Sequence, residues 1–131
     1  MALIVLDASV LIALLDPADA LHAGMTVALR RHAGDDLKIP SSAYSESLVG
    51  PARRGRSKEA RDAVRALLAE VVLLNEHIAE EAAELRAQHS KLRLPDALVI
   101  ATGNVLDADV ILTGDPGWRH LAHSVQVVAE S

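Results

Sequence analysis

The chain has 131 residues, no cysteine and a net charge of −5, and half of its residues are hydrophobic. This composition excludes disulfides, thiolate metal sites and a disordered chain, and it lacks the basic balance typical of nucleic-acid-binding proteins. No apolar run approaches the ~20 residues of a membrane span, and the N-terminus has no basic segment typical of a signal peptide. We therefore expect a single domain over residues 1–131, a cytoplasmic location and no membrane association.

The first half of the chain alternates short apolar runs with segments that begin at good helix caps. Apolar runs rich in β-forming residues predict strands, whereas Ser, Asp and Pro mark helix starts. The expected elements are a strand at 3–7, a helix from Ser9, a helix at 16–32 capped by Asp16, a strand at 37–40 and a helix at 41–50 that "PARRGR" interrupts.

The same alternation continues in the second half. The stretch "LPDALVIA" is apolar on all sides after Pro95, which is typical of a buried helix. The other expected elements are a helix from Ser57 to about Glu70, a strand at 71–74, a helix at 76–89 capped by Asn75, and strands within 109–115 and 124–128. This order predicts a three-layer α/β/α sandwich with a mainly parallel sheet of about five strands.

Four carboxylates occupy positions at which ligands gather in such sheets, beyond the carboxyl ends of the strands. Asp7 closes the first strand, Asp115 follows the fourth, Asp96 begins the buried helix, and Glu46 lies in the helix after the second strand. Each has a structural alternative: Asp7 as a helix cap, Asp96 as a dipole partner, Asp115 as a turn residue and Glu46 as a solvated residue.

Clustered carboxylates would require a cation. Two like charges ~4 Å apart repel by ~4 kcal/mol at an effective dielectric near 20. Oxygen ligands without cysteine favour Mg²⁺, for which Mn²⁺ could substitute, and such a site suits hydrolysis of a phosphodiester.

The motifs around these residues give the chain a family resemblance. "VLDASVLIALL", "YSESL", "LPDALVIATG" and "ILTGDPGW" resemble the motifs of PIN-domain ribonucleases, especially VapC-type toxins, over nearly the whole chain. The resemblance implies a catalytic quartet of Asp7, Glu46, Asp96 and Asp115, with metal held by Asp7, Asp96 and Asp115. It also implies supporting roles for Ser9 and Thr113. Trp118 stands where the family usually has Phe, a departure that we interpret as packing.

The resemblance also implies a function and partners. The expected protein is a metal-dependent endoribonuclease that cuts structured RNA, often tRNA or ribosomal RNA. It would act as the toxin of a type II toxin–antitoxin pair, be inhibited by a co-encoded antitoxin and form a homodimer.

A basic segment offers candidates for RNA binding. Arg53, Arg54, Arg56 and Lys58 surround Gly55 and could clamp phosphates, although a solvated loop between helices explains them equally well. His120 and His123 have metal-like spacing but no acidic neighbour fixed nearby in sequence.

Two other functions remain open from the sequence. A PIN-like scaffold could bind partners without catalysis. A receiver domain also has an acidic Mg²⁺ pocket, but it needs an Asp after the third strand and a Lys after the fifth. This chain has Asn75 and Glu76 at the first position, and no Lys follows Lys91.

Overall fold

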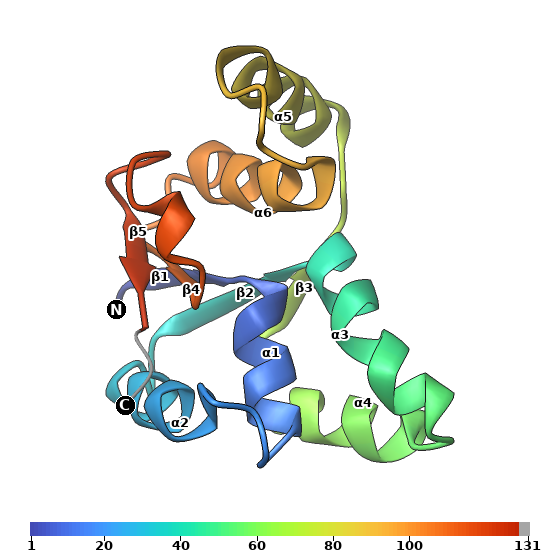
Figure 1. Ribbon diagram of the computed structural model, residues 1–131. Helices are drawn as coiled ribbons and strands as arrows, with labels where there is room; N and C mark the ends of the chain where they lie inside the picture. Colours follow the sequence, from blue (N-terminus) through green and yellow to red (C-terminus); the bar gives the residue numbers. More distant parts are fainter. Residues whose placement is uncertain (129–131) are drawn as a thin grey trace.

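The computed structural model describes residues 1–128 and shows a sheet of five parallel strands in the order β3-β2-β1-β4-β5 (Figure 1). The strands are β1 (Leu3–Leu6), β2 (Asp36–Pro40), β3 (Glu70–Val72), β4 (Val110–Thr113) and β5 (Val125–Val127). The mainly parallel sheet predicted from the sequence is confirmed.

Helices cover both faces of this sheet and complete the predicted three-layer sandwich (Figure 1). They are α1 (Ala8–Leu15), α2 (His22–Arg31), α3 (Ser41–Arg53), α4 (Ser57–Arg65), α5 (Glu76–Gln88), α6 (Leu94–Val105) and the short 3₁₀ helix η1 (Pro116–Trp118). Right-handed crossovers from β1 to β2 and from β2 to β3 put α1 to α4 on one face of the sheet. The crossover from β3 to β4 runs in the opposite direction across the sheet and puts α5 and α6 on the other face. None of the helices within residues 1–128 is long and apolar enough to cross a membrane.

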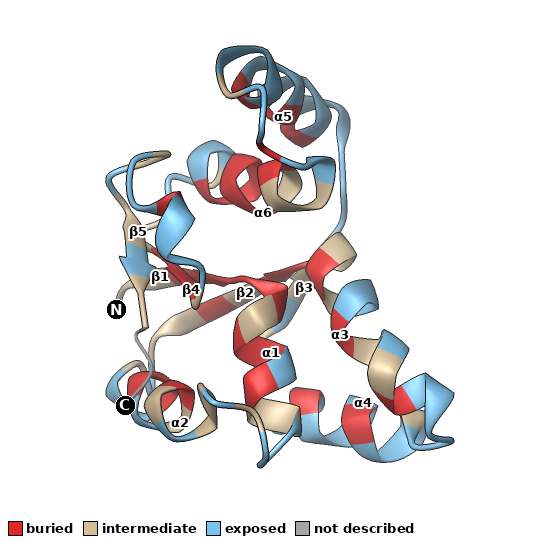
Figure 2. Ribbon diagram, in the orientation of Figure 1, coloured by how far each residue is buried: buried red, intermediate tan, exposed pale blue. Residues whose placement is uncertain are grey.

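The core lies between the central strands and the helices packed on them (Figure 2). The side chains of Ile4, Val5 and Leu6 in β1 are fully buried, as expected for a central parallel strand covered on both faces. Helix α6 packs between the sheet and α5, which explains why its sequence is apolar on all sides. Gly103 lets α6 approach β4 closely, because a Cβ at this position would collide with the Ile111 side chain.

The helix expected at 16–32 begins later, at His22. Asp16 ends α1 and its carboxylate accepts a hydrogen bond from the Ala18 amide at 2.9 Å, and Asp19 accepts one from Leu21 at 2.8 Å. These side-chain turns compete with the helix for the backbone amides, so the segment before α2 forms turns instead.

The expected boundary at residue 50 was also wrong, because α3 continues through Pro51 to Arg53. Proline in a helix removes one backbone hydrogen bond. Pro51 is buried and lies in the last turn, where few residues follow, so packing offsets this loss.

The boundaries of α4 differ from the prediction, whereas the start of α5 agrees with it. Ser57 is the first residue of α4 rather than its cap, and α4 ends at Arg65 because Leu68 adopts a left-handed conformation that redirects the chain into β3. Asn75 caps α5 as predicted, since its carbonyl oxygen accepts a hydrogen bond from the Ile78 amide at 2.9 Å.

Candidate active site

The candidate site lies where β1 and β4 end side by side in the middle of the sheet. Strands are added from β1 toward β3 in one direction and from β4 toward β5 in the other, so this is the topological switch point. Ligands of open α/β sheets bind beyond the strand ends at such a point. Asp7 follows β1 directly, and Asp115 comes two residues after the end of β4.

Asp7 is buried and held by several hydrogen bonds. Its Oδ1 accepts a bond from the Ala8 amide at 2.7 Å, and this bond caps α1. Its Oδ2 accepts bonds from the Ser9 hydroxyl at 2.7 Å and the Thr113 hydroxyl at 2.8 Å. Burial nevertheless outweighs these bonds and raises the pKa of Asp7.

The same two hydroxyls connect the ends of β1 and β4. Ser9 Oγ accepts a hydrogen bond from the Gly114 amide at 3.0 Å, and Thr113 Oγ1 accepts one from the Asp115 amide at 3.1 Å. Asp115 in turn accepts a bond from the Gly117 amide at 2.8 Å, which starts η1. Asp7 and Asp115 therefore do have the structural roles of cap and turn residue, and these roles fix one oxygen of each carboxylate in place.

Asp96 lies in the first turn of α6 and is half-buried, with no hydrogen-bond partner among residues 1–128. Burial raises its pKa, and the negative charges of Asp7, Asp115 and Glu46 raise it further, whereas Arg93 acts in the opposite direction. The four residues of the carboxylate cluster (Asp7, Glu46, Asp96 and Asp115) therefore lie within electrostatic reach of one another.

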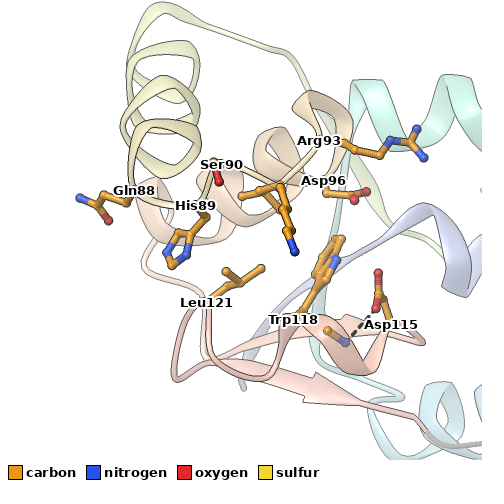
Figure 3. Close-up of a pocket in the computed structure, with 11 residues that line it drawn as sticks. Gln88, His89, Ser90, Arg93, Asp96, Asp115, Trp118 and Leu121 are labelled. Carbon is orange, nitrogen blue, oxygen red and sulfur yellow. Dashed lines mark hydrogen bonds between the residues drawn. The ribbon is translucent and has the colours of Figure 1, made fainter.

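A cleft of about 660 Å³ opens beside this cluster. Figure 3 shows Asp96, from the start of α6, and Asp115, from the segment after β4, at one end of the cleft. Trp118 forms part of the floor and is only 2% exposed, in agreement with a packing role. Asp7 lies beneath the surface, and exposed Glu46 projects from α3 outside the cleft lining.

The PIN domain family matches residues 4–124, which is most of the chain. The chain belongs to the PIN domain family. Among curated protein sequences, no match is found.

Solved structures share the fold of this PIN domain. A toxin–antitoxin complex from Klebsiella pneumoniae superposes with a TM-score of 0.81 and 22% identity, covering 97% of this chain and 98% of that chain. VapBC2 from Rickettsia felis, bound to a promoter DNA fragment, gives a TM-score of 0.74 and 12% identity over 98% and 97% of the two chains. The sarcin–ricin-loop-cleaving toxin VapC20 from Mycobacterium tuberculosis gives a TM-score of 0.65 and 19% identity over 82% and 86%.

The donor set of the PIN domain fits a hard divalent cation. It consists of carboxylates whose mutual repulsion is only partly offset by Arg93, and Asp96 has no hydrogen-bond donor among the described residues. In this arrangement of side chains, no three His, Cys, Asp or Glu residues within residues 1–128 are close enough together to hold a metal ion. Mg²⁺ does not require such a group, because it keeps several waters and is usually held by one or two carboxylates with substrate phosphates.

The basic turn (residues 53–58) does not lie beside the carboxylates. Arg53 is about two helical turns, or ~10 Å, beyond Glu46 along α3. Gly55, with φ of 70°, ends this helix. The Gly55 amide donates a hydrogen bond to the Ala52 carbonyl, and the Arg56 amide donates one to the Pro51 carbonyl.

Structural roles account for part of this basic turn. Cations at a helix C-terminus are favourable, and Arg53 is in the last turn of α3. Lys58 pairs with Asp62 at 2.9 Å. His120 and His123 line a separate cavity on the other side of η1 and do not contribute to the carboxylate cluster.

Sequence reasoning missed the basic side chains that do line the cleft. His89, Lys91 and Arg93 lie in the connection between α5 and α6. A signal was present, since cations directly before a helix start are unfavourable for the helix dipole and call for another explanation.

Proposed function

We propose that this PIN domain is a metal-dependent endoribonuclease that hydrolyses RNA phosphodiester bonds as the toxin of a type II toxin–antitoxin pair. The observation that carries the proposal is the carboxylate cluster at the switch point, in which the charges of Asp7, Asp115 and Glu46 all raise the pKa of Asp96. Such repulsion is costly in a folded protein unless a cation is bound there in the working state.

In this mechanism Asp7, Asp96 and Asp115 would hold Mg²⁺, for which Mn²⁺ could substitute. The bound ion would supply a water of lowered pKa and charge for the departing oxygen. Ser9 and Thr113 position Asp7 by donating hydrogen bonds to its Oδ2. The Ala8 amide holds Oδ1, whose remaining lone pair therefore keeps a fixed direction. Glu46, exposed on α3, completes the negative field around the site.

The neighbours in structure support the substrate and the partners that we propose. One of them is described as a sarcin–ricin-loop-cleaving toxin, another as a toxin–antitoxin complex, and a third as VapBC bound to DNA. We propose structured RNA, either tRNA or ribosomal RNA, as the substrate. A co-encoded antitoxin would silence the enzyme, and an Arg or Lys of that protein would find its charge partner in the carboxylate cluster. A homodimer and a cytoplasmic location are part of the same proposal.

The strand order argues against a receiver domain. Receivers have the order 2-1-3-4-5, whereas this sheet has 3-2-1-4-5. Asn75, three residues after the end of β3, is occupied as the cap of α5.

Mapping the cleavage products tests the proposed function. Purified protein is incubated with structured RNA in Mg²⁺, in Mn²⁺ and in EDTA, and the new RNA ends are sequenced and chemically typed. Attack by water on phosphorus predicts a 5′-phosphate and a 3′-hydroxyl, with no cleavage in EDTA. A 2′,3′-cyclic phosphate, or full activity in EDTA, would contradict the mechanism, and a protein that binds its partner without ever cutting RNA would be an interaction module.

A further inference from the structure

The cleft beside the carboxylate cluster is also lined by basic side chains. Its acidic end carries Asp96 and Asp115 (Figure 3). The connection between α5 and α6 contributes His89, Lys91 and Arg93 to the lining. We call residues 89–93 the basic loop. A cleft lined by both acidic and basic side chains suits a ligand with several anionic groups. One of these groups would share a cation with the carboxylates, and another would contact the basic side chains.

The basic loop has a fixed conformation. The His89 amide bonds to the Leu85 carbonyl at 2.9 Å, and the Leu92 amide bonds to the His89 carbonyl at 2.9 Å. The Leu92 carbonyl also accepts a bond from Arg86 Nε at 3.1 Å. The loop is therefore held to α5 twice, through the Leu85 carbonyl near its start and through the Arg86 side chain near its end.

Burial of Leu92 determines where its neighbours go. The Leu92 side chain is 9% exposed and belongs to the core, whereas Lys91 and Arg93 on either side are exposed and line the cleft. Neither cation has an ion-pair or hydrogen-bond partner within residues 1–128. Their charges remain available to a ligand, in contrast to Lys58, which is paired with Asp62.

The position of Arg93 in the cleft indicates which anionic group it would bind. Arg93 lies next to Asp96, as its effect on the pKa of that carboxyl shows, so an anion bound there is adjacent to the proposed metal. A nucleic-acid strand whose scissile phosphate is at the metal has its neighbouring phosphate close by. Cations bind such phosphates, and so do helix starts without a side-chain cap, as at α6.

We propose that the basic loop is the phosphate-binding subsite of this enzyme, and that Lys91 and Arg93 bind the RNA backbone next to the scissile bond. This inference rests on the proposed function, because it concerns the RNA strand cut at the carboxylate cluster. It also moves the principal RNA contact from the basic turn to the basic loop. The basic turn would then contact only distant parts of a long structured RNA.

The test measures RNA binding without cleavage. A fluorescent single-stranded RNA of about six nucleotides, near the lower end of known site sizes, is titrated in EDTA at several salt concentrations. We expect Lys91→Gln and Arg93→Gln each to weaken binding roughly fivefold, the upper range of an exposed charge pair. The double variant should lower the slope of log affinity against log salt by ~1.4, since each phosphate contact contributes ~0.7.

Two further double variants serve as controls. Arg30→Gln with Arg61→Gln removes two exposed cations from α2 and α4, on the other side of the sheet, and should leave the slope unchanged. Arg54→Gln with Arg56→Gln tests the basic turn directly. A wild-type slope in the Lys91/Arg93 double variant, or a loss found only in the Arg54/Arg56 variant, would overturn the proposal.

Cleavage assays in Mn²⁺ separate this inference from the function on which it rests. If wild-type protein cuts RNA, the double variant should show a raised KM with a nearly unchanged kcat, as expected for lost substrate binding. If the RNA binds through Lys91 and Arg93 but is never cut, the subsite stands and the ribonuclease proposal fails. If the wild-type protein binds no RNA, the subsite is refuted.

Discussion

The carboxylate cluster and the basic turn both draw attention in the sequence, yet the fold treats them very differently. Asp7 is buried where two central strands end, and two hydroxyls and a backbone amide hold its carboxylate. The basic turn connects α3 and α4, contains Gly55 in a left-handed conformation, and is partly paired through Lys58. Charge that is fixed at an energetic cost indicates function more strongly than charge placed where the backbone favours it.

The largest expected effect comes from Asp96→Asn. This change keeps the size of the side chain but removes a charge from the proposed metal site, so RNA cleavage should fall by roughly 100-fold or more, equivalent to several kcal/mol of lost charge stabilisation. The measurement is the rate of RNA cleavage at saturating Mn²⁺. If Asp96 only interacts with the helix dipole, cleavage should stay at the wild-type rate.

The same variant should melt at an equal or higher temperature than wild type. The folded-state pKa of Asp96 is raised, so ionisation of this carboxyl destabilises the folded metal-free protein at neutral pH. This penalty disappears as pH falls through the raised pKa toward the unfolded value, and the advantage of Asp96→Asn should shrink with it. Melting curves in EDTA at several pH values would measure this, and a lower melting temperature at neutral pH would show that the charge is stabilising.

A smaller effect is expected for Thr113→Val, which breaks the connection between the strand ends. The side chain is fully buried, its hydroxyl donates to Asp7, and it accepts from the Asp115 amide. Loss of the hydroxyl should destabilise the protein by ~1–3 kcal/mol and reduce cleavage, because Asp7 loses a donor that positions it. Thr113→Ser retains the hydroxyl and should restore cleavage. If the methyl group alone mattered, Thr113→Val, which keeps a methyl at that position, would cleave normally and Thr113→Ser would be impaired.

The smallest effect is expected in the basic turn. Arg54→Ala should weaken binding of a long structured RNA, lower its salt dependence by roughly one phosphate contact, and leave metal affinity unchanged. Anisotropy titrations with long and short RNA compare the two cases. A loss as large as that of the Lys91 and Arg93 variants, on short RNA as well, would show that the basic turn belongs to the catalytic cleft.

Much of the fold could be predicted because local patterns and packing agree. The alternating strands and helices, the Asn75 cap and the buried helix after Pro95 all depend on short stretches of sequence. The carboxyl ends of parallel strands share one edge, so the positions of Asp7 and Asp115 along the chain already indicated that edge.

Other features depend on side-chain contacts and burial that the pattern of apolar residues does not reveal. The late start of α2 follows from Asp16 and Asp19 turns that compete with helix formation, and Pro51 is tolerated in α3 because it is buried. The exposure of Lys91 and Arg93 toward the cleft follows from the burial of Leu92, which no local pattern reveals.

Binding of Mn²⁺ tests the central claim, that the carboxylate cluster is a metal site, most directly. The electron paramagnetic resonance signal of free Mn²⁺ is followed while wild-type protein, Asp96→Asn and the distant control Asp62→Asn are added in turn. We predict that wild-type protein and Asp62→Asn remove the free signal with equal affinity, and that Asp96→Asn binds at least tenfold more weakly, a difference of ~1.4 kcal/mol or more. Equal Mn²⁺ affinity in all three proteins would contradict the account.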